Sequence, residues 1–528
     1  MQFVSEPSTA VKIQKMKQRV RWQDPLIQER QIDQTQFILD DGAASSEDSE
    51  FSFLVIGDSG AGAHLSQNPQ RQVAELMAEH RDECRFVLHT GDVVYLVGSK
   101  EFYPSNFIEP YREFLVGGDY PAQIRYDRMV FKVPILPVLG NHDYYELPIV
   151  YGVLSQLSLP IRRLFRSRID FDVGFHGSGK GDAYARAFLD YLCGIANRQE
   201  LARHLDRRYT GQTRTGRCLR YQPKEFTRLP NRYYAFHYGG IDFFALDSNT
   251  FNAPLPLSLD AEGENHRHRL AEKKLEVEQQ KEDAIEQSTQ LNPNDPIEAE
   301  QLDDLRTKIE HLEEMERDID KQLQTTESPD VDYEQLEWLQ DRLIESWHTQ
   351  SVRGRIIYFH HPPYVTEATK WEQSQTLAVR YRLRHVFDRV AEAVGEQAQH
   401  RPLVDLVLNG HAHCLEYLRT TTTGHADANI NWIVCGGSGY SLRRQRPEGT
   451  DLTETVEQPG QPEPRLVARS HLFVGRTGQG SRKRRPYSFI RIDVKAGQPL
   501  KLVVRPYVAE RYQRTWSNQV LPAIELGG

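Results

Sequence analysis

Metal-binding residue types stand at the ends of short apolar runs along this chain. The motifs are GDSG, GDVVY, GNHD, FHHPPY and NGHAH, and the residues in them are Asp58, Asp92, Asn141, His360, His411 and His413. Carboxylate, amide and imidazole groups together form a ligand set for hard to intermediate cations. Two such cations about 3.5 to 4 Å apart suit the hydrolysis of phosphate esters. The residue types therefore predict a metal-dependent hydrolase.

The apolar runs before these motifs predict buried strands of an α/β layered domain. FSFLVIG (51–57) is short and nearly all apolar, and the amphipathic segment RQVAELMAEHRDE separates it from the next run, RFVLHTG. Further runs lie at 133–140, 241–247, 355–361, 404–410 and 431–437. Loops at the carboxyl ends of strands converge on the ligand crevice in open α/β sheets. We therefore expect the motifs to meet in one site.

Each motif has a structural alternative when it is taken alone. A GD after a strand is often only a turn, and NHD is often a helix cap or an Asx-turn. A lone histidine near a strand end usually makes hydrogen bonds within the fold. The combination of five motifs, in this order and at the same end of each strand, favours a single site.

The order GDxG, GDxxY, GNHD, HxPxY and GHxH resembles the calcineurin-like metallophosphoesterase superfamily, and specifically its purple acid phosphatase branch. The segments FFALDSNTF and YEQLEWLQDRL look like the smaller type of that branch. The resemblance covers about residues 50–440, apart from two insertions. It implies a layered metallophosphoesterase fold, in which a β-sheet sandwich is flanked by helices.

The resemblance also implies two metal ions. The first would be held by Asp58, Asp92, Tyr95 and His413, and Asp92 would bridge to a second ion held by Asn141, His360 and His411. Fe(III) is expected at the first position, and Fe(II), Zn(II) or Mn(II) at the second.

The first motif departs from that of the wider superfamily, and Tyr95 supplies a possible substitute ligand. Most relatives have D-x-H at the first motif, whereas this chain has Asp58, Ser59 and Gly60. Tyr95 replaces the missing histidine in this interpretation. A phenol with a reference pKa of about 10 loses its proton on a strongly charged cation, and the hard phenolate oxygen favours Fe(III). The alternative is a structural Tyr95 that packs in the sheet.

The implied activity is hydrolysis of phosphate monoesters by a metal-activated hydroxide. Two cations lower the pKa of a bound water toward neutrality, so no side-chain nucleophile is required. We expect His142 to contact the phosphoryl group and to protonate the leaving oxygen, with Asp143 orienting its ring. His361 is expected to face the other side of the strand, because successive side chains alternate.

Two other functions stay open at this point. The same metals serve a phosphodiesterase that acts on nucleotide or phospholipid-type diesters, and the pocket walls, expected from residues 144–240 and 364–385, decide between them. A metal-bound protein that acts only through an interaction surface at residues 262–328 is the third hypothesis. The complete ligand set argues against it. The expected substrate is a phosphorylated small molecule or protein.

Length and charge limit the class of protein. The chain has 528 residues, with 74 acidic and 65 basic side chains and a formal charge of -9, which argues against general nucleic-acid coating. Five cysteines without a C-x-x-C pair indicate neither a disulfide framework nor a zinc ribbon. No stretch reaches the ~20 apolar residues of a membrane helix, and no signal peptide is visible. A cytoplasmic protein is expected, although purple acid phosphatases are typically exported, glycosylated or lysosomal.

The composition divides the chain into five parts. We expect a flexible arm at 1–50, a first core part at 51–261, a helical insertion at 262–328, a second core part at 329–445, and a polar loop with completing strands at 446–528. Residues 145–230 and the basic cluster 481–485 receive no role.

The helical insertion has a heptad-like apolar pattern. It is formed by Leu302, Leu305, Ile309, Leu312, Ile319 and Leu323. The pattern predicts an antiparallel, coiled-coil-like hairpin that projects from the body. Such a hairpin is either a solvated structural element or an arm for self-association or a partner.

Overall fold

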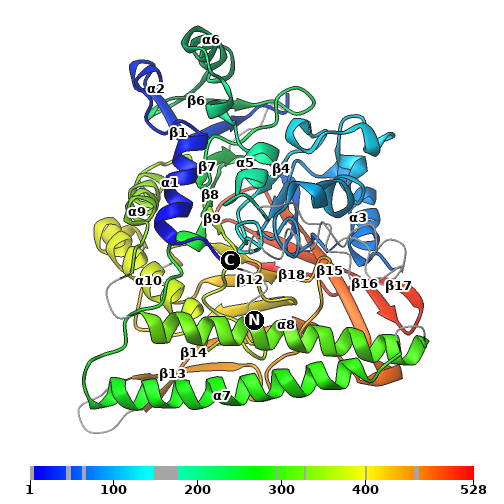
Figure 1. Ribbon diagram of the computed structural model, residues 1–528. Coiled ribbons are helices and arrows are strands. Elements are labelled where there is room, and N and C mark those ends of the chain that lie inside the picture. The colour runs from blue at the N-terminus through cyan, green and yellow to red at the C-terminus, as the bar shows by residue number, and fades with distance from the viewer. Residues whose placement is uncertain are drawn as a thin grey trace.

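Two β-sheets flanked by helices form the body of the molecule in the computed structural model (Figure 1). The structure describes residues 5–42, 49–61, 67–147, 177–292, 295–325, 329–398, 401–456 and 463–527. The helices with α-helical geometry are α1 (Thr9–Arg19), α2 (Pro25–Glu29), α3 (Pro69–Glu79), α5 (Asp182–Phe188), α6 (Arg198–Arg208), α7 (Ala261–Thr289), α8 (Pro296–Gln324), α9 (Tyr333–Trp347) and α10 (Ser374–Val394). None of these helices is long and apolar enough to cross a membrane.

The larger sheet has 11 strands in the order β13-β14-β11-β12-β10-β9-β8-β7-β1-β6-β5. Its strands are β1 (Ile32–Leu39), β5 (Gly211–Thr213), β6 (Gly216–Tyr221), β7 (Tyr234–Tyr238), β8 (Ile241–Ala245), β9 (Gly354–Tyr358), β10 (Leu406–Asn409), β11 (Leu415–Thr420), β12 (Asn431–Cys435), β13 (Asp451–Val456) and β14 (Glu463–Val474). Within it, β8, β9, β10 and β12 are parallel neighbours. Parallel strands end on the same side, so the loops after β9 and β10 lie together.

The smaller sheet has 7 strands, in the order β17-β16-β15-β2-β3-β4 with β18 beside β16. Its strands are β2 (Phe51–Ile56), β3 (Val87–His89), β4 (Ile135–Pro137), β15 (Arg484–Val494), β16 (Leu502–Tyr512), β17 (Thr515–Val520) and β18 (Ile524–Leu526). β2, β3 and β4 are parallel neighbours, and the C-terminal β15 pairs with β2 in the antiparallel sense. All six residues of β2 are buried, because other layers cover both of its faces.

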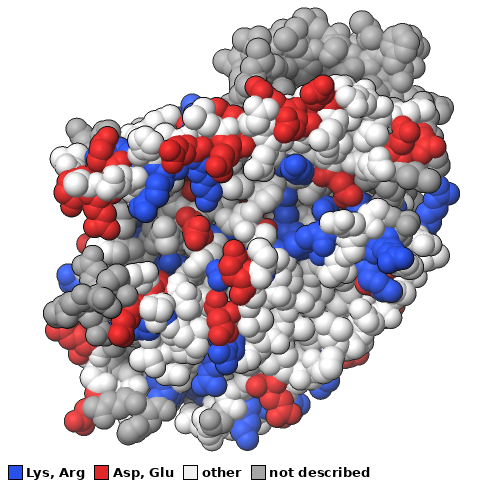
Figure 2. All heavy atoms as spheres, turned by 90° about the horizontal axis from the view of Figure 1, so that it is seen from below, with Lys and Arg blue, Asp and Glu red and all other residues white. Residues whose placement is uncertain are grey.

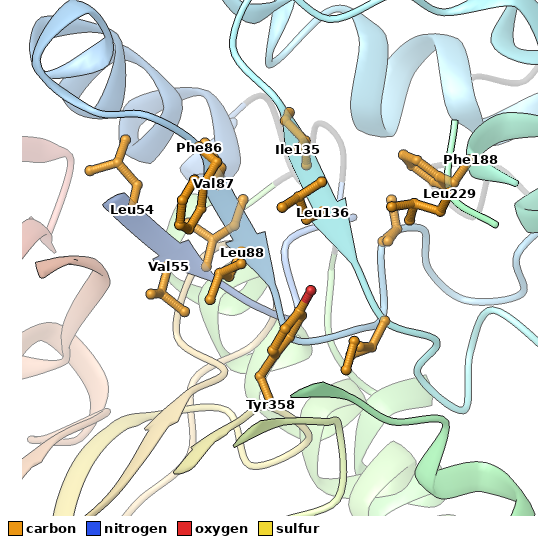
Figure 3. Packing of buried hydrophobic residues seen from close by; sticks show 14 of the residues in the cluster. Leu54, Val55, Phe86, Val87, Leu88, Ile135, Leu136, Phe188, Leu229 and Tyr358 are labelled. Atoms are coloured by element: carbon orange, nitrogen blue, oxygen red, sulfur yellow. The ribbon is translucent and has the colours of Figure 1, made fainter. Parts of the chain in front are cut away.

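The two sheets share one hydrophobic core. Figure 3 shows side chains of β2, β3 and β4, among them Val55, Leu88 and Leu136, gathered around Tyr358 of β9 in the other sheet. Aromatic rings join the sheets elsewhere, since Phe53 of β2 meets Phe243 of β8 edge to face with ring centroids 5.6 Å apart. This shared core fixes the position of the parallel strand ends in one sheet relative to those in the other sheet.

The N-terminal segment is ordered where the structure describes it. The sequence predicted a flexible arm for residues 1–50, but α1, α2 and β1 lie within that range, and β1 pairs with β6 and β7. Gln34 and Thr35 are buried, and Lys12 donates to the carbonyl of Asn249 at 3.2 Å. The prediction was wrong because polar composition alone does not reveal that a strand is completed by partners almost 200 residues away.

Helices α7 and α8 pack side by side as an antiparallel pair (Figure 1). Val277 of α7 lies in one cluster with Leu312 and Ile319 of α8, and Lys274 pairs with Asp320 at 2.7 Å. The sequence predicted that this pair would project from the body. Instead, α8 lies against the body, and α7 lies on the outer side of α8. Figure 2 shows the face on this side, where basic and acidic side chains are interspersed.

Hydrogen bonds and ion pairs attach α8 to three separate segments of the body. The buried Asp318 accepts from the Ser374 backbone N–H at 2.8 Å, and Thr307 Oγ1 lies 2.8 Å from Ser441 Oγ. Lys483, from the basic cluster without an assigned role, forms an ion pair with Asp304. Lys483 therefore anchors α8.

The region from 145 to 230 is described in part. Residues 148–176 lie outside the described residues. The remainder forms α5, α6, β5 and β6, and Tyr184 of α5 donates to the Pro137 carbonyl at the end of β4 at 2.9 Å. This part of the region therefore supports the strand that leads into the GNHD motif.

Candidate metal centre

The structure brings together the seven side chains for which the sequence predicted metal binding. They follow β2, β3, β4, β9 and β10, and they are Asp58, Asp92, Tyr95, Asn141, His360, His411 and His413. All seven are buried, and none has more than 7% of its surface exposed. Asp58, Asp92 and His411 have φ values of 53°, 53° and 66°, a left-handed conformation that costs energy for residues other than glycine. Such strain gathers at functional sites, where the surrounding fold maintains it.

Tyr95 lies at the centre of one side of this cluster, which we call the Tyr95 side. Its Oη is 2.8 Å from Asp58 Oδ1, 2.8 Å from Asp92 Oδ2 and 3.2 Å from His413 Nε2. One phenolic proton cannot satisfy three such neighbours. The Tyr95 side therefore holds more acceptor atoms than protons, which is the arrangement that a cation requires.

Asn141 lies at the centre of the other side, which we call the Asn141 side. Its Oδ1 is 2.9 Å from His360 Nε2 and 3.0 Å from His411 Nδ1. Asp92 Oδ2 is 3.4 Å from His360 Nε2, so this carboxylate reaches both sides. Two groups of possible ligands, Asp58 with Asp92 and His360, and His360 with His361 and His411, each place their ligand atoms within 4.8 Å of one another.

Backbone carbonyls orient two of the three histidines. His360 Nδ1 lies 2.9 Å from the Thr90 carbonyl oxygen, and His413 Nδ1 lies 2.9 Å from that of Ser441. A carbonyl only accepts, so each Nδ1 carries a proton and Nε2 is the nitrogen directed into the cluster. Outer hydrogen bonds of this kind are typical of histidines that bind metals.

Burial and the charges of neighbouring groups shift the pKa values of Asp58 and Asp92 in opposite directions. Burial raises the pKa of Asp58 to about 8, against the charge of His360, which lowers it. Burial acts in the same sense on Asp92, but the charges of His360 and His142 outweigh it and hold its pKa well below the usual range. Burial and the two carboxylates keep the pKa of Tyr95 well above its ordinary value. Without a cation the phenol therefore retains its proton.

His142 lies beside the Tyr95 side. Its ring is 4.2 Å from the Tyr95 ring and 4.7 Å from the Tyr145 ring, measured between centroids, and its backbone N–H donates to Asp92 Oδ1 at 2.8 Å. Its Nδ1 contacts the carbonyl oxygen of Leu96, which orients the ring. Burial lowers the pKa of His142.

The sequence predicted that Asp143 orients the His142 ring, but the structure places its carboxylate elsewhere. Its carboxylate accepts from the backbone N–H of Gly140 at 2.9 Å and of Val93 at 3.2 Å. Burial raises its pKa to about 8. Asp143 thus links the GDVVY and GNHD loops, while the Leu96 carbonyl orients the His142 ring. The two residues are adjacent in the sequence, which suggested a contact between their side chains. The backbone turn directs the Asp143 carboxylate away from His142.

His361 lies closer to the cluster than the sequence predicted. Strand β9 ends at Tyr358, so the alternation of side chains no longer applies at residue 361. The His361 ring lies 4.5 Å from the His411 ring between centroids. Its nitrogens have partners within the fold, Ser248 Oγ at 2.8 Å and Asn252 Nδ2 at 3.2 Å.

Several neighbours of the cluster lie outside the sequence motifs. Tyr440 stacks on Tyr95 with ring centroids 3.9 Å apart and planes within 6°. The outer nitrogen of His411 is surrounded by Lys370, by Gln375 of α10 and by Glu314 of α8. Lys370 and Gln375 lie within 364–385, where the sequence predicted a pocket wall, whereas only the fold brings Tyr440 and Glu314 to the site.

Comparisons with known proteins give no family assignment. No protein-family model matches the chain, and no curated protein matches it in sequence. Similar solved structures include GAP50, the anchor in the inner membrane complex of Plasmodium, with 10% identity, a TM-score of 0.38, and coverage of 90% of this chain and 88% of that one. Another is the purple acid phosphatase PPD1 from yellow lupin (Lupinus luteus) seeds, with 13% identity, a TM-score of 0.39, and coverage of 90% and 53%. Both likenesses are too weak to carry an argument about function.

Proposed function

We propose that the protein is a metal-dependent phosphoric ester hydrolase that acts on phosphate monoesters at a dinuclear centre. The observation that carries the proposal is the meeting of seven buried ligand-type side chains around Asp92. Their possible ligand atoms lie 2.8–3.2 Å from Tyr95 Oη and 2.9–3.0 Å from Asn141 Oδ1. Oxygen and imidazole nitrogen atoms that converge in this way in a buried site are suited to bind cations.

The donor types assign a different cation to each side. The Tyr95 side offers two carboxylates, a phenol and one imidazole, a hard set that suits Fe(III). The Asn141 side offers an amide oxygen, two imidazoles and the shared Asp92, which suits Fe(II), Zn(II) or Mn(II). When bound, two such cations lower the pKa of water toward neutrality and neutralise the charge on phosphoryl oxygens.

His142 is the residue that we assign to proton transfer. The Leu96 carbonyl holds the Nδ1 proton, so in the doubly protonated ring Nε2 is the nitrogen that gives its proton to the leaving oxygen. The Tyr95 and Tyr145 rings on either side restrict rotation of the imidazole. Burial lowers the pKa of this ring, which makes its proton easier to release.

Initial rates on an aryl phosphate monoester and on the matching diester, from pH 4 to 9, test this proposal. We expect the monoester to be preferred by the protein loaded with metal. His142→Ala should reduce the rate by about 10²- to 10⁴-fold, the usual contribution of a general acid. Its metal content should equal that of the wild type, because none of the seven proposed ligands is changed.

The other outcomes separate the competing functions. A preference for the diester would assign the protein to the phosphodiesterases. Absence of turnover on both substrates, with two metal ions bound per chain, would contradict hydrolysis of simple phosphate esters and direct attention to binding by α7 and α8.

A further inference from the structure

His411 differs from the other two histidines of the candidate centre in the partners of its outer nitrogen. Backbone carbonyls face the outer nitrogens of His360 and His413. The outer nitrogen of His411 is Nε2, because Nδ1 faces Asn141 Oδ1. Side chains from two segments, residues 370–375 and α8, surround this Nε2.

Among the described residues around His411 Nε2, two are donors and one is a carboxylate. Lys370 Nζ lies at 3.0 Å and Gln375 Nε2 at 2.9 Å. Glu314 Oε1, from α8, lies at 3.4 Å and also forms an ion pair with Lys370. An ammonium group only donates, so beside Lys370 the Nε2 atom of His411 accepts and Nδ1 carries the proton toward Asn141.

A cation on the Asn141 side requires the opposite tautomer. Binding through Nδ1 needs the lone pair of that nitrogen, so the ring proton must move to Nε2. A proton on Nε2 in a buried site needs an acceptor, and of the two ionic groups there only Glu314 accepts. Metal-binding histidines commonly donate their other N–H to a carboxylate in this way.

We propose that Glu314 is a positioning residue for the candidate centre, which accepts the Nε2 proton of His411 and so directs its Nδ1 toward the metal. This inference rests on the proposed function, because it presumes a cation on the Asn141 side. It makes α8 a part of the centre and not a separate arm.

The surroundings of Glu314 suit this role. Lys370 is buried, with 3% of its surface exposed, and its ammonium group forms an ion pair with Glu314. A carboxylate has two oxygens that accept, so Glu314 can accept from both Lys370 and His411. The contacts of Asp318 with Ser374 and of Thr307 with Ser441 lie on either side of Glu314 along α8 and fix the position of the helix.

Titration of Zn²⁺ into the metal-free full-length protein, against a chromophoric chelator, tests the proposal without measuring activity. We expect the wild type to bind two Zn²⁺ ions per chain. Glu314→Gln should weaken binding at one position by about 10- to 100-fold, the usual effect of removing such an outer partner, and leave the other position unchanged. Glu314→Asp, which retains the charge, should recover part of the affinity.

Two further variants make the result specific. Glu313→Gln removes the same charge from the adjacent residue of α8, which makes no described contact with His411, and should bind Zn²⁺ as the wild type does. Glu314→Gln combined with Lys370→Gln removes both charges, so no buried ammonium is left unpaired. If the carboxylate is required, the double variant should bind as weakly as the single one. Thermal unfolding of each variant shows whether it is folded.

Each failure has a distinct meaning. Equal affinity of the wild type and Glu314→Gln at both positions would overturn the role of Glu314 and leave the metal centre intact. Wild-type affinity in the double variant would also overturn it, because the loss would then come from the unpaired Lys370. A wild type that binds neither Zn²⁺ nor Fe²⁺ would overturn the proposed function itself, and this inference with it.

Discussion

The two sides of the candidate centre are built from different parts of the fold. The Tyr95 side consists of loops that follow strands, and its histidine is oriented by the Ser441 backbone carbonyl. The Asn141 side uses the same kind of loops, but the outer nitrogen of His411 faces Glu314, Lys370 and Gln375. A backbone carbonyl is present whatever the side chain is, whereas a side-chain partner depends on the docking of a distant helix. We therefore expect the Asn141 side to be the more sensitive to changes in α8.

Asp92→Asn is the change that should affect both sides at once. Asp92 Oδ2 lies 2.8 Å from Tyr95 Oη and 3.4 Å from His360 Nε2, so its carboxylate belongs to both sides. We expect loss of metal from both positions and a fall in the monoester rate of about 10³-fold or more, since two cations supply several kcal/mol of transition-state stabilisation. Metal content and initial rates measure the two effects. A variant that retains both ions would show that Asp92 does not bridge the two sides.

Tyr95→Phe should affect one side only. The change removes the phenolic oxygen among Asp58, Asp92 and His413 and leaves the contacts of Asn141 in place. We expect aerobically purified wild type to show a visible phenolate-to-iron absorption band that is absent from the variant. Metal affinity should fall by about tenfold or more on the Tyr95 side alone. A colourless wild type with full activity would show that Tyr95 is structural.

Glu416→Gln should change stability and leave both sides unaffected. Glu416 lies on β11 and accepts from the Thr366 backbone N–H at 3.0 Å, and burial raises its pKa from 4.5 to about 7. Between these values the unfolded chain has released the proton while the folded protein retains it. The free energy of unfolding of the wild type therefore falls as the pH rises from about 4.5 to 7, by up to about 3 kcal/mol.

Glu416→Gln lacks this pH dependence because its amide does not ionise. Relative to the wild type, we expect the variant to be more stable at pH 8 than at pH 4, by up to about 3 kcal/mol. Urea unfolding at the two pH values measures the difference, and metal content provides the control. Parallel curves for the two proteins would show that Glu416 has an ordinary pKa in the fold.

The sequence predicted the α/β architecture and the composition of the cluster, because both depend on local patterns. Apolar runs such as FSFLVIG predicted buried strands, and polar residues directly after them predicted a shared site at the strand ends. The structure brings the side chains predicted to bind metal together, but their role as ligands stays a prediction. The identity of the second metal and the substrate have no local signal.

The predictions that failed concern long-range partners. Residues 1–50 are polar, yet β1 is placed in the larger sheet by β6 and β7. Residues 262–328 have a helical pattern, yet the pattern did not indicate that α8 would lie against the body. Asp143 is adjacent to His142 in the chain, yet its carboxylate binds the loops after β3 and β4.

By itself, the sequence determined which apolar runs form buried strands and which residues follow them, because apolar periodicity and turn chemistry act over a few residues. Only the tertiary structure decided which groups complete the environment of those residues. Glu314 reaches His411 across almost 100 positions in the chain because Asp318 and Thr307 fix α8 against the body. Such a contact depends on the sum of many packing and hydrogen-bonding energies, and no short pattern records that sum.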